Sequence, residues 1–576
     1  MSHIHRLIID NYRGIKHLDC DFGDETLVIL IGRGDSGKST ILNAIHAVLS
    51  PSWNMTFNDL DFHNQDLSKP ITIEAIVSGL PQEILKESKF GLYTLPLDDN
   101  DFNPSRLCLR IILTVTDTLE PHWCVRVDAD GQIPDKPISA NDRALLSVNL
   151  IGDYSDNQFA YNRQSPLYSL TKKSLEEGQS IEVVKSKLLR AINETADKKH
   201  LAPLNLPLSD LRERAILLGL SISEIEAQID IKENPYTGNS IALHDGGLPF
   251  RLRGKGSKRL MSIAIQTELT KSGGIVLVDE IEQGLEPDRI ITLLSILKNT
   301  GEGQVFLTTH SIHVIIEACW NNLFILSNSR NEINLYKCPS DLESCRRLNP
   351  HAFFAKRLIC CEGKTELGIV RAFNRIIQDA DHENFSSLGI SMINCNGGDQ
   401  MYTIAKKMKN LGYDVCVFAD DDIPKELKRK KQAATEAEIP LFLCDEGNCI
   451  EAQIIQDLPW NALFDLINCP QTDFPSHNIV VDEQIETAVS SAEPTPEESK
   501  RIRTRLVELS IDKDSEGKLD KKGRAVKKKE WFKHIPGGKF LGELIIKHWE
   551  QLKFSTTRQN LEKLKNWALH NANRLD

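Results

Sequence analysis

Short apolar runs, each ended by turn-forming residues, predict β-strands in the first part of the chain. The runs are rich in aliphatic and β-branched side chains and lie at residues 4–9, 27–31, 71–77 and 107–116. A glycine-rich turn follows the second run, and a helix is expected from about Ser39. Strand character returns at residues 274–278 and 305–307. This pattern predicts one α/β domain assembled from two separated segments of the chain.

The stretch between these two segments has helical periodicity. Ile181, Val184, Leu188 and Ile192 recur at intervals of three or four, and residues 208–229 also have a helical pattern. We therefore expect a helical insertion at residues 141–235, flanked by domain segments at residues 1–140 and 236–350.

A second α/β domain is expected at residues 351–576. Apolar runs at residues 357–361, 391–395 and 414–418 alternate with helical patterns at residues 365–378 and 399–411. Such alternation is typical of a parallel sheet with helical crossovers. Residues 482–494 are polar and predict a loop, whereas Thr495 and Pro496 are favourable for a helix start. This helix belongs to an expected C-terminal helical extension.

The composition is that of an ordinary globular protein, with 576 residues, 40% hydrophobic and 26% charged. No apolar run approaches the roughly 18 residues of a membrane span, and the N-terminus lacks the features of a signal peptide. The 13 cysteines are scattered through apolar stretches, which favours reduced thiols over disulfides. We expect a cytoplasmic protein.

The formal net charge of −12 excludes a passive nucleic-acid coat, because binding to phosphates depends on local positive charge. Two basic runs, at residues 425–431 and 518–533, are candidates for such local contacts. A solvated helix face or loop would give the same pattern, so neither run decides the question alone.

Residues 32–39 match a complete phosphate-binding loop between a predicted strand and a predicted helix. Glycines allow backbone N–H groups to turn toward phosphates, the lysine supplies positive charge, and the serine hydroxyl can reach Mg²⁺. The expected nucleotide contacts are Gly32, Gly34, Gly37, Lys38, Ser39 and Thr40. The sequence therefore predicts ATP binding at this turn.

Further along the chain, residues 275–278 form an apolar strand that ends in Asp279 and Glu280. Asp279 is placed to reach the Mg²⁺ of the nucleotide, and Glu280 is placed to polarise an attacking water. His310 ends the next predicted strand, where it would sense the γ-phosphate. A strand-end acidic pair or a surface histidine is common by itself, so the order of these residues carries the interpretation.

Carboxylates follow the strands of the second domain in the same way. Glu362 and Glu366 follow the first strand, Asp420 and Asp422 follow the third, and Glu451 begins a later helix beyond Asp445 and Glu446. The carboxyl ends of parallel strands meet at one sheet edge. Clustered carboxylates are unfavourable unless a divalent cation such as Mg²⁺ or Mn²⁺ neutralises them. The sequence predicts a site for one or two such ions.

The first set of motifs resembles the SMC/RecF/OLD branch of ABC-type ATPases. In that branch two heads close on ATP, and a signature loop from one head contacts nucleotide on the other. The corresponding loop here is residues 253–258, with Gly254 and Gly256 as expected nucleotide contacts, just before a helix expected from Arg259. It departs from the usual Leu-Ser-Gly-Gly pattern.

The second set resembles a TOPRIM domain, with Gly397 and Gly398 matching its middle turn. A TOPRIM domain behind an ABC-type ATPase is similar to the OLD (overcoming lysogenization defect) nucleases, and particularly to Gabija-type or retron-associated defence nucleases. The resemblance implies an N-terminal ATPase head and a C-terminal nuclease domain. It also implies Mg²⁺-dependent DNA cleavage in anti-phage defence, and a homodimer or larger assembly formed through the ATPase. A partner subunit of the helicase or reverse transcriptase kind is a further implication.

Two other functions remain open at this point. An ATP-dependent DNA clamp or loader of the SMC/RecF kind would use the same head but would not need the acidic set. A topoisomerase or primase shares TOPRIM carboxylates, but no evident nucleophilic tyrosine or need for an ABC-type head supports it. The family resemblance also implies a catalytic lysine near the C-terminus. Lys539, after two glycines and at an expected helix start, is our candidate, with Lys527, Lys528, Lys529 and Lys533 as phosphate contacts.

Overall fold

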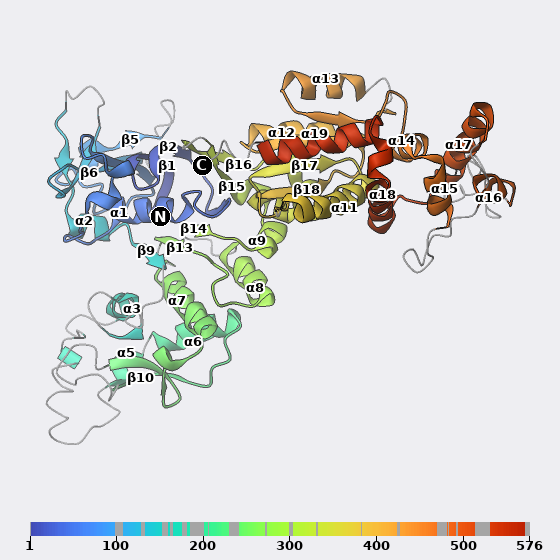
Figure 1. Ribbon diagram of the computed structural model, residues 1–576. Coiled ribbons are helices and arrows are strands. Elements are labelled where there is room, and N and C mark those ends of the chain that lie inside the picture. The colour runs from blue at the N-terminus through green and yellow to red at the C-terminus, as the bar shows by residue number, and fades with distance from the viewer. Residues whose placement is uncertain are drawn as a thin grey trace, which may run out of the picture. The chain divides into compact units, whose positions relative to one another are not determined.

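The computed structural model divides the chain into two compact units, Met1–Ser340 and Asp341–Asp576, which are described separately. The described residues are 2–97, 107–127, 133–151, 159–161, 165–174, 181, 183–184, 201–205, 207–229, 241–270, 273–298, 303–329, 332–381, 383–422, 427–468, 481, 483–490, 494–512 and 530–570. Figure 1 shows the chain with many of its helices and strands labelled.

The first unit begins with an antiparallel sheet in the order β2-β1-β4-β6-β7-β8, with β5 paired to β6. Its inner face is aliphatic, as the sequence pattern predicted, and carries Leu7, Ile73 and Ile111 into the core. The strands are β1 (His3–Tyr12), β2 (Ile15–Asp21), β4 (Ile71–Ser78), β5 (Leu95–Pro96), β6 (Leu107–Val115), β7 (Pro121–Arg126) and β8 (Lys136–Pro137).

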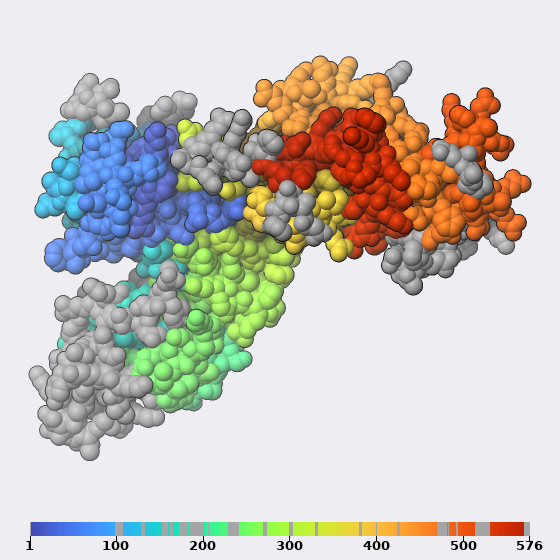
Figure 2. Space-filling view, viewed as in Figure 1, coloured from blue at the N-terminus to red at the C-terminus, as the bar shows by residue number. Residues whose placement is uncertain are grey.

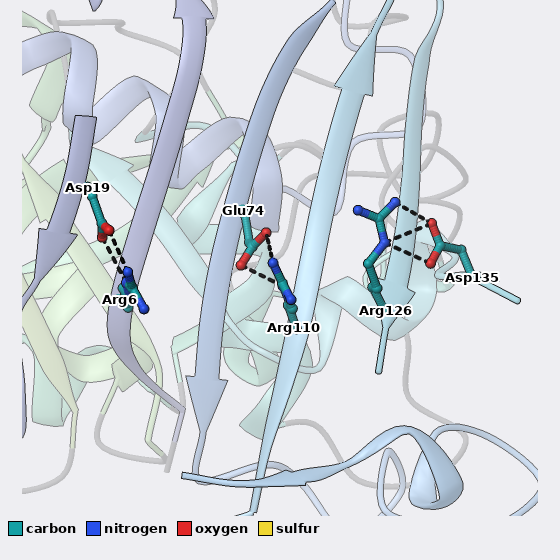
Figure 3. Close-up of polar contacts among 6 residues, drawn as sticks. All are labelled: Arg6, Asp19, Glu74, Arg110, Arg126 and Asp135. Atoms are coloured by element: carbon teal, nitrogen blue, oxygen red, sulfur yellow. Dashed lines mark hydrogen bonds and ion pairs between the residues drawn. The ribbon is translucent and has the colours of Figure 1, made fainter. Parts of the chain in front are cut away.

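The antiparallel sheet also carries arginine–carboxylate pairs between neighbouring strands (Figure 3). The most buried pair joins Arg110 on β6 to Glu74 on β4 through two hydrogen bonds of 2.6 and 2.9 Å. Arg6 and Asp19 make a similar but more exposed pair between β1 and β2. These bidentate contacts hold neighbouring strands in one register.

A parallel sheet lies behind the antiparallel one, in the order β16-β15-β3-β14-β13-β9. Only β15 and β16 pair in antiparallel fashion. Helix α1 (Lys38–Leu49) contacts strands of both sheets and buries Ile41, Ile45 and Val48 between them. The strands are β3 (Leu27–Ile31), β9 (Val148–Ile151), β13 (Ile275–Val278), β14 (Gln304–Thr308), β15 (Leu323–Ser329) and β16 (Glu332–Lys337).

The region expected to be a helical insertion is mixed in structure. Its strand β9 completes the parallel sheet beside β13, and the expected helix at residues 208–229 ends early. Gly219 takes a left-handed φ of 84°, which closes α6 (Leu208–Leu217), and β10 (Ile225–Ile229) then pairs with β11 (Ile241–Asp245). Of Ile181, Val184, Leu188 and Ile192, the last two lie outside the described residues.

Helices complete the first unit. Helix α7 (Lys255–Thr270) contacts β9 and β13 on one side and α3 and α6 on the other, which links the mixed region to the parallel sheet. The remaining elements are α2 (Ala140–Ala144), α3 (Pro166–Ser174), α5 (Ala202–Asn205), β12 (Leu248–Pro249), α8 (Pro287–Lys298) and α9 (Ile312–Glu317).

The second unit is built on a parallel sheet in the order β18-β17-β19-β20. Helix α12 contacts β17 and β19, while α11, α14, α18 and α19 share one hydrophobic core with the other face. Its first elements are α10 (Glu343–Leu348), β17 (Arg357–Cys361), α11 (Lys364–Asp381), β18 (Ile390–Asn394), α12 (Gly398–Asn410), β19 (Asp414–Ala419), α13 (Lys428–Glu436), β20 (Leu441–Leu443) and α14 (Ile450–Asp457).

The C-terminal helices are α15 (Trp460–Ile467), α16 (Glu483–Val489), α17 (Pro496–Ser510), α18 (Ile535–Lys547) and α19 (Thr556–His570). On the face in Figure 2, α18 and α19 (red) cover the middle of the second unit, and α15–α17 (orange) lie toward its right-hand end. Helix α16 lies where a loop was predicted, because Ile485 and Val489, one helical turn apart, are both buried. Helix α17 starts at Pro496 with a Thr495–Glu498 capping box, as predicted.

None of the helices in the described ranges is long and apolar enough to cross a membrane. Cysteines in those ranges are free thiols, and most are buried.

Candidate functional site

The turn between β3 and α1 has the geometry of a phosphate-binding loop. Lys38, the first residue of α1, is buried and donates from Nζ to the carbonyl oxygens of Gly32 at 3.0 Å and Arg33 at 2.8 Å. Burial lowers the pKa of Lys38 to about 8, although nearby Asp279, Glu280 and Glu282 oppose the shift. The ammonium group is therefore held inside the loop, where the phosphates of a nucleotide would replace the carbonyl contacts.

Glycine is required at two positions of this loop. Gly32 has a φ of 151°, and a Cβ there would lie 2.6 Å from the carbonyl oxygen of Leu326. Gly37 has a φ of 93°, in the region that side chains rarely adopt. Gly34 is exposed with open space around it, and Thr40 follows Ser39 in the first turn of α1. The loop therefore presents backbone at Gly34 to solvent.

The carboxylate at the end of β13 meets the loop. Ser39 donates to Asp279 Oδ1 at 3.0 Å, and the Thr308 hydroxyl, at the end of β14, donates to the same oxygen at 2.6 Å. Buried Arg259 on α7 donates to the backbone carbonyls of both Asp279 and Glu280. Asp279 and Ser39 are thus close enough to share one bound cation.

Glu280 is exposed and has a left-handed φ of 48°, which is strained for a residue with a side chain. Its N–H donates to the Thr308 hydroxyl at 2.7 Å, which fixes this backbone. Glu282 accepts from Thr309 Oγ1 at 2.7 Å and from the N–H of His310 at 2.5 Å. His310 is exposed, and burial together with the charge of Lys38 lowers its pKa.

The candidate signature loop forms the start of α7, which begins at Lys255 and not at Arg259 as expected. Arg253 before it pairs with buried Asp245. Gly254 is exposed with open space, whereas a Cβ on Gly256 would lie 2.4 Å from the carbonyl oxygen of Gly284. A glycine at residue 256 therefore allows the helix to approach the loop that follows β13.

In the second unit, strand order reverses between β17 and β19, and both strands end in acidic residues. Such a reversal leaves a crevice at the carboxyl edge of a parallel sheet. Glu362 follows β17, and its Oε2 accepts a hydrogen bond from the N–H of Asp420, after β19, at 3.3 Å. Gly398 makes room for Glu362, because a Cβ there would lie 2.9 Å from Glu362 Oε1.

Two further carboxylates lie in this crevice. Glu366, in the first turn of α11, accepts from the N–H of Gly363 at 2.8 Å, and Glu451 lies in the first turn of α14. Both are buried, at 2% and 1% exposure. Within the described ranges, Asp420 Oδ1 and both carboxylate oxygens of Glu451 have no hydrogen-bond partner. Buried oxygens without a partner call for an explanation, and a bound water or ion is one that fits polar atoms of this kind.

Electrostatics show how crowded these carboxylates are. Burial, Glu366 and Glu362 raise the pKa of Asp420 to about 9. Burial and Glu451 raise the pKa of Glu366 to about 7, and burial raises the pKa values of Glu362 and Glu451 as well. Because of this burial and crowding, the four groups can be ionised together only if positive charge is close by.

Lys533 is the described lysine whose charge acts on all four of these groups. Its Nζ lies 3.9 Å from Glu451 Oε1. Burial alone would lower the pKa of Lys533, but Glu451, Asp420 and Glu366 outweigh it and raise the pKa. The buried neighbours Trp531 and Phe532 anchor the segment that carries this lysine.

Comparison with protein families identifies both domains. Residues 27–317, about half of the chain, match the family described as "AAA domain, putative AbiEii toxin, Type IV TA system". Residues 353–422 match the family described as "Overcoming lysogenization defect protein-like, TOPRIM domain". The chain belongs to the OLD family of ATPase–TOPRIM proteins. The predicted α/β fold class, with an N-terminal ATPase domain and a C-terminal TOPRIM domain, is confirmed.

Individual relatives are more distant from this OLD-family protein. Uncharacterized proteins from Mycobacterium bovis and Mycobacterium tuberculosis are 41% identical over 46 residues, which is 8% of this chain and only 5% of theirs. The Smc head domain of Pyrococcus furiosus, bound to the C-terminal domain of ScpA, has a TM-score of 0.37 and 14% identity over 61% of this chain and 99% of that one. The recombination mediator RecF has a TM-score of 0.34 and 13% identity over 58% and 98%.

Other predicted residues lie at the edge of the TOPRIM site or outside it. Asp422 is exposed and near enough to Glu362 to raise its pKa. Asp422 lines a cavity of about 520 Å³ together with Asp421, Lys428, Lys431, Gln432, Thr435, Glu446 and Gly447. Asp445 accepts from Thr556 at 2.9 Å and from Gln453 at 3.1 Å, so these hydrogen bonds hold its carboxylate in place.

The C-terminal basic residues separate into distinct environments. Lys539 is half exposed on α18 and pairs with Glu543 at 3.6 Å. The helix starts at Ile535, earlier than expected, because the His534 ring accepts from the N–H of Gly537 and caps it. In the other basic run, Lys428 and Lys431 pair with Glu446 and Asp421. Lys527, Lys528 and Lys529 lie outside the described residues.

Tyr402 of α12 is a site residue that sequence reasoning missed. Its side chain is 2% exposed, and its hydroxyl has no hydrogen-bond partner among the described residues. Burial and the charges of Asp421, Glu362 and Asp420 raise its pKa. The position four residues after Gly398, one turn into the helix, was the available signal.

Proposed function

We propose that this protein is a nucleotide-regulated, divalent-metal-dependent DNA endonuclease. The observation that carries the proposal is the buried carboxylate set of Glu362, Glu366, Asp420 and Glu451, with orphaned oxygens on Asp420 and Glu451. An ATP-dependent clamp that only holds DNA has no need for such a costly arrangement.

The residues present fit a divalent cation. The donor set consists of carboxylate oxygens, which suits Mg²⁺ or Mn²⁺. The pKa values of Asp420 and Glu366 are raised, as expected for buried carboxyl groups with too little positive charge around them. Glu362, Glu366, Asp420 and Glu451 would hold the metal, with exposed Asp422 as an additional ligand on the solvent side. A cation bound there would supply Lewis-acid stabilisation of a phosphodiester under attack.

The protein's own groups would do the rest. Lys533, 3.9 Å from Glu451, contributes a fixed positive charge beside the reacting phosphate. The Tyr402 hydroxyl, which has no hydrogen-bond partner among the described residues, would be available to position a water or a phosphate oxygen. Lys539 stays a candidate for the catalytic lysine that the family resemblance implies, since it lies in α18, the helix that follows the anchored segment of Trp531 and Phe532.

In the ATPase domain, Lys38 and the backbone of Gly32, Gly34 and Gly37 would bind the phosphates. Ser39 and Asp279, whose side-chain oxygens lie 3.0 Å apart, would share Mg²⁺. Thr40, the next residue of the loop, would be a further nucleotide contact. Strained Glu280 would orient the attacking water as general base, and His310 would contact the γ-phosphate.

We further propose that two copies associate through the ATPase domain. Exposed Gly254, just before α7, and half-buried Gly256 in its first turn would then contact nucleotide on the other copy. The descriptions of the two matched families, one naming a toxin system and the other a lysogenization defect, support a role in bacterial anti-phage defence. A helicase-like or reverse transcriptase partner is a proposal of the same kind.

The test is cleavage of supercoiled plasmid by the purified chain with Mg²⁺ or Mn²⁺, with and without ATP, and with EDTA as a control. Glu451→Gln should abolish nicking, whereas Glu446→Gln, an exposed carboxylate in the adjacent cavity, should cut normally. The metal site would be refuted if the wild-type protein still cut plasmid in EDTA, or if Glu451→Gln cut plasmid at the wild-type rate.

A companion experiment separates the lysines. At saturating DNA, Lys533→Ala should reduce cleavage severely while DNA binding is kept. Lys539→Ala tests the family-based candidate in the same assay. If the protein retained DNA in the presence of ATP but cut none of it with any of the metals, the clamp function would be favoured.

A further inference from the structure

A second group of metal-binding side chains lies in the ATPase domain, at the start of β1. His3 and His5 are on the strand, and Asp24 is in the turn between β2 and β3. One ligand atom from each of the three residues lies within 4.8 Å of the others. The two imidazole rings are 4.5 Å apart at their centroids. This arrangement has no part in the nucleotide site or the carboxylate site.

A β-bulge positions His5. The register of β1 against β4 pairs Ile4 with Val77 and Arg6 with Ile76, so His5 is the extra residue. Bulges re-aim a side chain away from the regular alternation of a strand. The Nε2 of His5 consequently contacts the Ser78 hydroxyl at 2.7 Å, while its Nδ1 lies 3.4 Å from Asp24 Oδ1.

His3 is held in a similar way, with its Nε2 2.9 Å from the carbonyl oxygen of Gly23. Buried Gln304 fixes the surrounding backbone, because its side chain accepts from the N–H of Ile4 and donates to the carbonyls of Ile4 and Glu25. The same amide lies 3.3 Å from His3 Nε2. One side chain therefore ties the start of β1 to the turn that carries Asp24.

We propose that His3, His5 and Asp24 bind a divalent transition metal of the zinc class, with water as fourth ligand. His5 Nε2 contacts the Ser78 hydroxyl, which fixes the ring with its Nδ1 facing Asp24, and the backbone carbonyl of Gly23 orients the ring of His3, as outer-shell partners orient metal-binding histidines. Ligands about 2.0–2.1 Å from a tetrahedral zinc lie about 3.3 Å apart. The 3.4 Å between His5 Nδ1 and Asp24 Oδ1 already has this length.

The site would serve the ATPase domain as a structural clip. Gln304 begins β14, whereas Thr308 and the nucleotide contacts lie at the other end of that strand. The clip is therefore at the opposite sheet edge from the phosphate loop. Imidazole ligands favour zinc, cobalt, nickel or copper, whereas the all-oxygen TOPRIM site favours magnesium or manganese. The two kinds of site can accordingly be loaded separately.

The experiment uses the full chain in excess Mg²⁺, which keeps the oxygen sites filled, and titrates Co²⁺ while recording visible absorption. Wild-type protein should bind one equivalent with tetrahedral bands, and Zn²⁺ should displace it. His3→Ala and Asp24→Asn should lose this signal. His17→Ala is the matched control, because His17 pairs with Asp10 at 2.6 Å on the same sheet and has no place in the cluster.

Thermal unfolding gives an independent readout, because a ligand that binds the folded state raises the melting temperature. Zn²⁺ should stabilise wild type and His17→Ala but not Asp24→Asn, whose exposed side chain can be changed without disturbing the core. Undiminished Co²⁺ binding in both His3→Ala and Asp24→Asn would overturn the proposal. A signal that disappears in Asp420→Asn but persists in Asp24→Asn would overturn it as well, since it would belong to the TOPRIM site.

Discussion

Replacing Asp420 by asparagine should stabilise the metal-free protein while abolishing cleavage. Burial and the neighbouring carboxylates raise the pKa of Asp420 to about 9, whereas an unfolded aspartate titrates near 3.9. At pH 7 the folded protein must therefore hold a proton that the unfolded chain has released. Each pH unit between the unfolded pKa and the working pH costs about 1.4 kcal/mol, so the cost at pH 7 is up to about 4 kcal/mol.

Asparagine resembles the neutral carboxyl group and takes up no proton. Because the folded pKa lies above the unfolded one, wild-type protein loses stability as the pH rises from about 3.9 toward 9. The variant avoids this loss, so its advantage should be absent near pH 4 and should grow through pH 7. We expect a gain of about 1–4 kcal/mol at pH 7, with relaxation of the site reducing the upper value.

The assay is urea unfolding in EDTA at pH 5, 7 and 8.5, repeated in Mg²⁺, where wild type should recover stability and the variant should not. Asp414→Asn is the control, because Asp414 begins the same strand and accepts from buried Arg357 at 3.0 Å. Loss of that ion pair should destabilise the protein and leave cleavage intact. An Asp420→Asn variant that is less stable than wild type at pH 8.5 in EDTA would refute the crowded-carboxylate reasoning.

Three other predictions concern the ATPase domain. Lys38→Ala should weaken ATP binding at least about tenfold by calorimetry without changing the circular dichroism, since Lys38 contacts its own loop and little else. Glu280→Gln should bind ATP but hydrolyse it about 100-fold more slowly or worse, and an unchanged rate would remove Glu280 from the mechanism. Glu74→Ala should lower the free energy of unfolding in urea by about 2 kcal/mol, because the Glu74 side chain is only 9% exposed. Asp19→Ala, in the more exposed pair, should lower it by about 0.5 kcal/mol. Equal losses would contradict the argument that burial makes the difference.

The parallel strands could be predicted closely from the sequence because their environment is uniform. Residues 27–31 and 357–361 are buried on both faces, so every position is apolar except Arg357, and the run itself marks the strand. The carboxylates that follow such runs were equally predictable, since parallel strands end at a common edge. Their approach in space, as for Glu362 and the N–H of Asp420, follows from this topology.

The remaining differences arise where tertiary contacts overrule local pattern. Residues 225–229 continue an apparent helical periodicity, but Gly219 ends α6, and pairing with β11 makes the segment a strand. Residues 483–489 are polar enough for a loop, yet two buried aliphatic side chains hold a helix. Tyr402 was missed because a buried tyrosine in an amphipathic helix has the sequence pattern of an ordinary core residue.

The family resemblance led to Lys539, and the structure adds Lys533 as a second lysine, close to the carboxylates. Gly538 does allow the close approach that its sequence implies, since a Cβ there would lie 2.0 Å from the carbonyl oxygen of Thr365. That contact, with the hydrogen bond from Thr365 to the carbonyl of Phe532 at 2.9 Å, anchors the segment before the helix. It is therefore Lys533 whose charge reaches the four carboxylates. A single lysine cannot neutralise four ionised carboxylates, so the metal-free protein holds protons on some of them. A metal ion would take the place of those protons, and this is the physical reason to expect one there.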